Sequence, residues 1–181
     1  LSKIAFLVKT RRDGKVKVPV ITDLLRSRGN EFLRASERIV LPRLVDALEM
    51  AIYLLEGLEA DLIAGLAGFD EECEWGTAHI KDAFQNMPVA PRERRAQCYK
   101  IWERYTTSDS LVFGAGPSPL IWGRMAAWAG RAAQGLFDFK ELLLQIFVDD
   151  PLWIVRGNAA QRRRLVVILL LFWQVFGLPF S

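Results

Sequence analysis

The sequence predicts an α+β fold in which antiparallel strand pairs are backed by helices. Residues 3–21 and 142–155 each carry two short apolar runs on either side of a turn sequence, which is the pattern of a β-hairpin. Residues 45–66 repeat apolar side chains at helical spacing, with a weak point expected at Gly57, and residues 161–176 form an almost wholly apolar helix. At 181 residues the chain can bury a core, as one compact domain or two joined subdomains.

The charge of the chain is nearly balanced, with 24 Lys and Arg against 21 Asp and Glu. The net +3 therefore gives only mild attraction to a polyanion. The basic residues are bunched, however, and a cluster can hold phosphate groups where an average charge cannot. The clusters lie at residues 9–17, 92–95 and 162–164. A solvated surface is the alternative interpretation of each cluster.

The two cysteines, Cys73 and Cys98, lie far apart without metal-ligand spacing, and the chain has a single histidine, so a zinc site is not expected. We expect reduced thiols and an intracellular protein, in the cytoplasm or the nucleus, because no secretory leader opens the chain. A start without Met indicates a fragment. The apolar segment 165–180 suggests a membrane anchor as an alternative, but it is shorter than the ~20 residues that span hydrocarbon.

One short stretch carries the chemistry: an apolar run that stops at two adjacent carboxylates, Asp149 and Asp150. Residues 142–148 predict a strand, Asp149-Asp150 the tight turn at its end, and residues 152–155 the returning strand. Neighbouring carboxylates repel each other, and a divalent cation would neutralise them. The alternative is a solvated Asp-Asp-Pro turn.

This stretch resembles the aromatic-x-Asp-Asp box of reverse transcriptases, and other motifs of that family follow in the right order over nearly all of the chain. The resemblance implies the fingers and palm of a retroelement RNA-directed DNA polymerase, with an antiparallel palm sheet backed by helices. Residues 1–44 would form a fingers-like hairpin and linker, and residues 45–181 a palm-like region, with the thumb absent. An RNA template, a DNA primer, deoxynucleoside triphosphates and Mg²⁺ (or Mn²⁺) are the implied partners.

Residues 77–89 resemble the first carboxylate motif of the family, a strand that runs into a short helix with the pattern Asp-x-x-x-Ala-aromatic-x-x-x-Pro. The matching residues are Ala83, Phe84 and Pro88. The catalytic aspartate of the pattern falls on His79, and imidazole is a poor ligand for Mg²⁺ and a tolerable one for Mn²⁺. Asp82 stands where the family contacts the triphosphate. The alternative for His79 is a histidine without a functional partner.

Two further positions of the resemblance concern the nucleotide. An aromatic ring at Phe84 would lie under the sugar and exclude a 2′-hydroxyl, which selects deoxynucleotides; an ordinary core phenylalanine is the alternative. Residues 111–122 resemble the third motif, Phe-Gly-x-x-x-Ser-Pro-x-x-Phe, at the start of a long helix. Gly114 would let the backbone approach the template and nucleotide closely.

The N-terminal hairpin resembles the basic fingers hairpin that folds over the incoming triphosphate. Lys9 and Lys17 would meet phosphate oxygens there. Two arginines that are common in the family are replaced by Pro19 and Leu25, so the bidentate fork of arginine is missing.

The resemblance implies catalytic roles for Asp149, Asp150 and the His79 position, with residue 79 lying beside the Asp-Asp hairpin and with Asp149 and Asp150 as metal ligands. In such polymerases one cation activates the primer 3′-hydroxyl and the other steadies the triphosphate. Because His79, Pro19 and Leu25 each replace a residue that this chemistry uses, two hypotheses stand. The chain is an RNA-directed DNA polymerase domain with impaired catalysis, or a decayed retroelement remnant that keeps the fold and binds nucleic acid without copying it.

Overall fold

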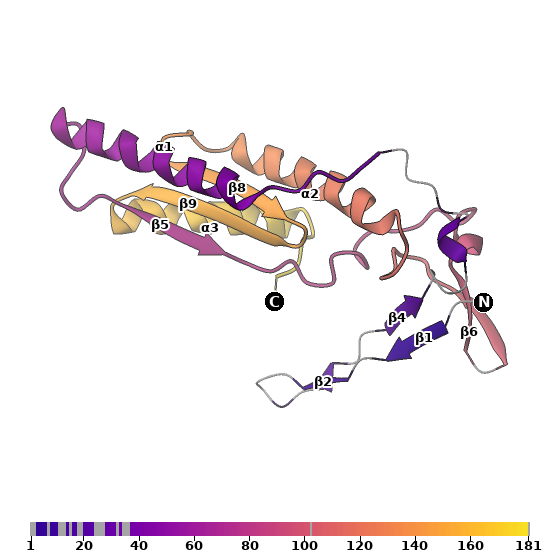
Figure 1. The fold of residues 1–181 in the computed structure, drawn as a ribbon. Coiled ribbons are helices and arrows are strands. Elements are labelled where there is room, and N and C mark those ends of the chain that lie inside the picture. Colours follow the sequence, from indigo (N-terminus) through magenta and orange to yellow (C-terminus); the bar gives the residue numbers. More distant parts are fainter. Residues whose placement is uncertain are drawn as a thin grey trace. The chain divides into compact units, whose positions relative to one another are not determined.

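The computed structural model forms two compact units (Figure 1). The hairpin unit comprises Leu1–Ile39 and Asp82–Trp122, and the sheet unit comprises Val40–Lys81 and Gly123–Ser181. The structure describes residues 3–6, 8–10, 14, 16–17, 20–23, 28–31, 33, 37–101 and 103–180. The assignment of residues 1–44 to fingers and 45–181 to palm stays a prediction.

A three-stranded antiparallel sheet is the centre of the sheet unit, in the order β5-β9-β8. Its strands are β5 (Glu72–Thr77), β8 (Leu142–Phe147) and β9 (Asp150–Gly157). Central strand β9 is the most buried, because it has a neighbouring strand on each side. It pairs with β5 as far as Thr77↔Leu152 and with β8 as far as Phe147↔Asp150. The predicted antiparallel sheet is therefore confirmed.

Helices pack against both faces of this sheet, and the alternation of side chains along β9 explains how. Ile154 packs with Ala51 and Leu54 of α1 (Leu44–Ile63). Trp153, one residue earlier, points to the other face, where its ring lies 6.4 Å from that of Trp173 in α3 (Ala159–Val175). Successive strand residues face opposite sides, so a single strand supplies both cores.

Helix α1 runs without a break through Gly57, contrary to the weak point expected there. Its buried residues lie on both sides of that glycine: Ala47, Ala51, Leu54 and Leu58. Burial of these side chains outweighs the cost of about 1 kcal/mol that glycine adds in a helix interior.

Helix α3 begins two residues earlier than predicted because its N-cap was missed. The side chain of Asn158 accepts hydrogen bonds from the backbone of Ala160 and Gln161, and the Gln161 side chain accepts one from Asn158 N, which completes a capping box. The helix ends before Gly177, which has φ +74°, as predicted. Within the described residues, no helix has the length and apolarity needed to cross a membrane.

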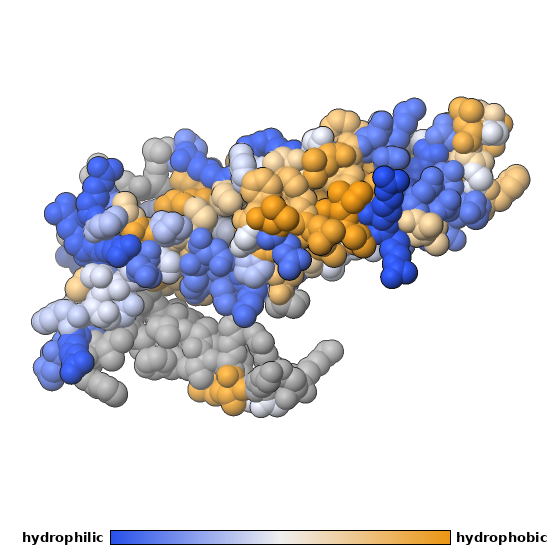
Figure 2. Space-filling view, turned by 180° about the vertical axis from the view of Figure 1, so that it is seen from behind, coloured by the Kyte–Doolittle hydropathy of each residue, from blue (hydrophilic) through white to orange (hydrophobic). Residues whose placement is uncertain are grey.

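The outward side of α3 carries exposed apolar residues, and apolar side chains gather on the face seen in Figure 2. The exposed apolar residues of α3 include Val167, Ile168, Leu171 and Val175, and exposed Phe176 follows directly after the helix. The inward side is closed by Trp173, which is fully buried and donates from Nε1 to the Ala129 carbonyl of helix α2 (Ser118–Gln134). Helix α2 begins at Ser118, within residues 111–122, where the start of a long helix was expected.

In the hairpin unit, β1 (Lys3–Phe6) pairs with β4 (Val20–Asp23), and β2 (Lys9–Thr10) pairs with β3 (Val16–Lys17). The predicted N-terminal hairpin is thus antiparallel. Its turn residues other than Gly14 lie outside the described residues, as do Pro19 and Leu25.

The remaining elements of the hairpin unit are short. Two 3₁₀ helices, η1 (Gly29–Glu31) and η2 (Arg94–Gln97), precede a second hairpin of β6 (Cys98–Ile101) and β7 (Arg104–Thr107). This second hairpin was not predicted from the sequence. Both cysteines are free, and they belong to different units.

Candidate functional site

His79, Asp149 and Asp150 form one cluster in the sheet unit. The Nδ1 atom of His79 lies 2.8 Å from Asp150 Oδ1 and 3.7 Å from Asp149 Oδ2. One ligand atom from each of the three side chains lies within 4.8 Å of the others. The expectation that residue 79 lies beside the Asp-Asp hairpin is confirmed, whereas the catalytic roles of these residues stay predictions.

Backbone hydrogen bonds on both sides of His79 hold it at the hairpin tip. Ala78 N donates to Pro151 O at 3.2 Å, and Ile80 N donates to Asp149 O at 2.7 Å. Ile80 is fully buried and forms a β-bridge with Phe180. The main chain that carries the imidazole is therefore fixed to the main chain that carries both carboxylates.

The turn of the hairpin differs from the predicted one by a residue. Because Phe147 pairs with Asp150, the two turn residues are Val148 and Asp149, not Asp149 and Asp150. Val148 has φ +57°, a conformation that β-branched residues rarely adopt. Backbone strain of this kind is often found where a side chain must be held in a functional position.

The cluster is open to solvent. The side chains of His79, Asp149 and Asp150 are 48%, 35% and 56% exposed. Water or a substrate can therefore reach all three, and the charge of the carboxylates is partly screened.

The donor set does not fit a pair of Mg²⁺ ions. Mg²⁺ prefers oxygen ligands in octahedral geometry, whereas one of the three donors here is an imidazole nitrogen. Two carboxylates also carry too little negative charge to neutralise two divalent cations. Two carboxylates and a neutral imidazole do suit a single divalent cation.

The other predicted site residues belong to the hairpin unit. They are Lys9, Lys17, Asp82, Ala83, Phe84 and Gly114. Lys9 and Lys17 are directly opposite each other in the β2–β3 pair. The proposed contacts of all six with a nucleotide stay predictions.

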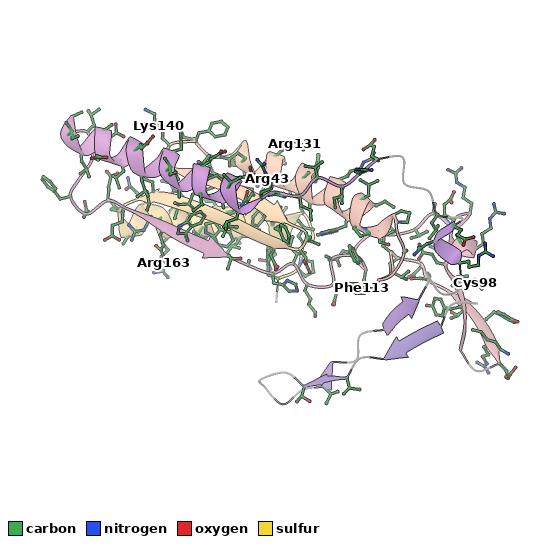
Figure 3. The ribbon with its side chains drawn as sticks, viewed as in Figure 1. Arg43, Cys98, Phe113, Arg131, Lys140 and Arg163 are labelled. Atoms are coloured by element: carbon green, nitrogen blue, oxygen red, sulfur yellow. The ribbon has the colours of Figure 1, made fainter. Side chains whose placement is uncertain are left out.

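The segment after β5 forms hydrogen-bonded turns, so the short helix predicted there is wrong. Asp82 has φ +52°, which a right-handed helix cannot contain. Asn86 N donates to Asp82 O, and Met87 N donates to Phe84 O. Ala83 is buried, and the ring of Phe84 packs edge-on against Phe113, labelled in Figure 3, with centroids 5.0 Å apart.

Asn30 clamps the loop that contains Gly114. Its Nδ2 donates to Gly114 O at 3.0 Å, and its Oδ1 accepts from Gly116 N at 2.9 Å. Gly114 has φ +94°, which glycine adopts readily. These two hydrogen bonds were not predicted, because nothing local to Asn30 indicates a partner 84 residues away.

No family model and no curated protein sequence matches the chain. Solved structures do: the foamy viral protease-reverse transcriptase in complex with double-stranded DNA has a TM-score of 0.57 at 11% identity, over 98% of this chain and 25% of that one. The native prototype foamy virus protease-reverse transcriptase has a TM-score of 0.55 at 12% identity, over 98% and 19%. The chain thus has a reverse-transcriptase-like α+β fold, and it spans a quarter or less of those chains.

Proposed function

We propose that the chain is the fingers-and-palm portion of an RNA-directed DNA polymerase, in which His79 impairs nucleotidyl transfer. The observation that carries the proposal is the cluster at the hairpin tip, where His79 Nδ1 meets Asp150 Oδ1 at 2.8 Å. The fold likeness supports the same assignment.

Some residues of the chain would bind the nucleotide, and others would take part in the chemistry. Lys9 and Lys17 would meet phosphate oxygens of the incoming nucleotide, and Phe84 would lie under its sugar. Asp149 and Asp150 would supply the negative charge that positions a divalent cation near the reacting phosphate. Because the donor set does not suit two Mg²⁺ ions, catalysis with Mg²⁺ would be weak.

A second function is favoured by the same contact. If the imidazole only makes a hydrogen-bonding contact with Asp150 and takes no part in catalysis, the domain binds an RNA–DNA duplex without copying it, as a decayed retroelement remnant would. The two functions share nucleic-acid binding and differ in primer extension with Mn²⁺, where the first predicts a trace and the second none.

Fluorescence anisotropy with a labelled DNA primer on an RNA template, in EDTA, tests the binding that both functions require. We expect binding that weakens steeply with salt, because phosphate contacts release counterions. The double change Lys9→Glu with Lys17→Glu should weaken it. As a control, Lys140→Glu alters a turn at the far end of β8 from the Asp-Asp tip and should have little effect.

Absence of any salt-sensitive binding would contradict both functions. Equal losses for the double change and for Lys140→Glu would contradict the role of the N-terminal hairpin.

A further inference from the structure

We infer that His79, Asp149 and Asp150 form a site for one borderline divalent cation, of the Mn²⁺ or Zn²⁺ type, in preference to Mg²⁺. The inference rests on the proposed function only in that it concerns the same cluster. It departs from the sequence-based expectation of no zinc site, because two carboxylates join the single histidine and neither Cys73 nor Cys98 is needed.

The distances between the ligand atoms suit a single cation. Three ligands around a tetrahedral cation at ~2.1 Å lie about 3.4 Å from one another. His79 Nδ1 is 2.8 Å from Asp150 Oδ1 and 3.7 Å from Asp149 Oδ2, which bracket that value. Small rotations of exposed side chains would turn the present hydrogen bond into two coordinate bonds to a shared ion.

The backbone holds the three ligands together before any ion binds. Hydrogen bonds from Ala78 N and Ile80 N fix the backbone of residue 79 to the hairpin, so the three ligands need no main-chain movement to converge. A site held in this way loses little entropy when the ion binds. The exposure of the side chains leaves the remaining coordination positions to water.

The charge and the chemical type of the three ligands also suit a single cation. Two carboxylates and a neutral imidazole balance one divalent cation, and among the described residues no other His, Cys, Asp or Glu joins the cluster. An imidazole nitrogen favours Zn²⁺ and Mn²⁺ over Mg²⁺, and the usual order of affinities places Zn²⁺ above Mn²⁺. The chemistry of this chain therefore departs from that of a three-carboxylate site.

The test is calorimetric titration of the whole chain with the chloride salts of Zn²⁺, Mn²⁺ and Mg²⁺. The protein carries no histidine tag, and Cys73→Ser with Cys98→Ser removes thiol ligands. We expect one equivalent bound, with Zn²⁺ at least tenfold tighter than Mn²⁺ and Mn²⁺ at least tenfold tighter than Mg²⁺. His79 is the single histidine of the chain, so its imidazole NMR signals are identified without ambiguity. Those signals should broaden when paramagnetic Mn²⁺ binds beside the ring.

Two substitutions of His79 test whether its imidazole sets the preference among the three cations. His79→Ala should weaken Zn²⁺ at least tenfold and leave the weak Mg²⁺ affinity unchanged. His79→Asp should reduce the preference for Zn²⁺ and strengthen Mg²⁺ at least tenfold. Asp109→Asn, an exposed carboxylate of the hairpin unit, serves as the control and should change none of these affinities. Circular dichroism checks that each variant is folded.

Equal affinities for the three cations, two equivalents per chain, or Zn²⁺ binding that survives His79→Ala would overturn the inference. Anisotropy with the primer–template in EDTA, on the same samples, separates this failure from that of the proposed function. Duplex binding without metal preference would sink only the inference, and metal preference without duplex binding would sink only the function.

Discussion

His79 Nδ1 lies 2.8 Å from Asp150 Oδ1, although 71 residues separate them in the sequence. The contact follows from the pairing of β5 with β9, which ends at Thr77↔Leu152 and leaves the next residues of both strands side by side. The register therefore holds position 79 beside the hairpin carboxylates. The identity of that one residue decides whether the cluster is a set of three carboxylates or a mixed nitrogen and oxygen site.

Gly76 makes room for the indole of Trp153 directly across the sheet. A Cβ atom at residue 76 would overlap Nε1 of that ring, which is almost fully buried. We expect Gly76→Ala to lower the free energy of unfolding by about 1–3 kcal/mol, the usual cost of overpacking. Urea denaturation of the variant and the unaltered protein measures this difference in the free energy of unfolding. In a Trp153→Leu background the same change should cost less, and an equal cost in both backgrounds would contradict the steric explanation.

Arg156 is a buried cation that ties β9 to α1. Its Nη2 lies 2.6 Å from Asp61 Oδ2 and 3.6 Å from Glu71 Oε2, and its side chain is 9% exposed. Asp61→Ala would leave the buried guanidinium with the longer pair alone, so we expect a loss of about 2–4 kcal/mol in the free energy of unfolding. Glu59→Ala, on the exposed side of α1, is the control. A loss below about 0.5 kcal/mol for Asp61→Ala would show that the pair is dispensable.

Phe84 is expected to select the sugar of the incoming nucleotide. In a variant with measurable activity, Phe84→Ala should relax discrimination against ribonucleotides on the order of tenfold or more, because the clash with the 2′-hydroxyl disappears. Phe113→Leu is the matched control, since it removes the ring that packs on Phe84 and keeps Phe84 itself. The ratio of the incorporation rates of deoxy- and ribonucleotides measures this discrimination in each variant. Unchanged selectivity in Phe84→Ala would remove the steric role.

Local patterns in the sequence predicted much of the fold. Apolar periodicity located α1, an almost wholly apolar run located α3, and two apolar runs on either side of a turn located the β8–β9 hairpin. The turn at Val148-Asp149 was placed one residue late, because Asp and Pro are common turn residues and Val at positive φ is not. The β6–β7 hairpin was missed, since its strands have only four residues each and each strand carries one charged residue.

The candidate site depended on long-range pairing that no local pattern specifies. The order of family-like motifs led to the expectation that His79 meets Asp149 and Asp150, and the β5–β9 register supplies the physical reason. The missed Asn30 clamp on Gly114 shows the limit of this approach, because an asparagine in a loop has many equally good local partners.

Primer extension on an RNA template tests the central claim most directly. With an imidazole in place of the third carboxylate, the rate should fall on the order of a thousandfold or more, so the unaltered chain should show no extension with Mg²⁺ and at most a trace with Mn²⁺. In a longer protein that includes a thumb domain, His79→Asp with Pro19→Arg should recover activity, because it restores a hard oxygen ligand and a phosphate fork. Robust Mg²⁺-dependent extension by the unaltered sequence would contradict the account.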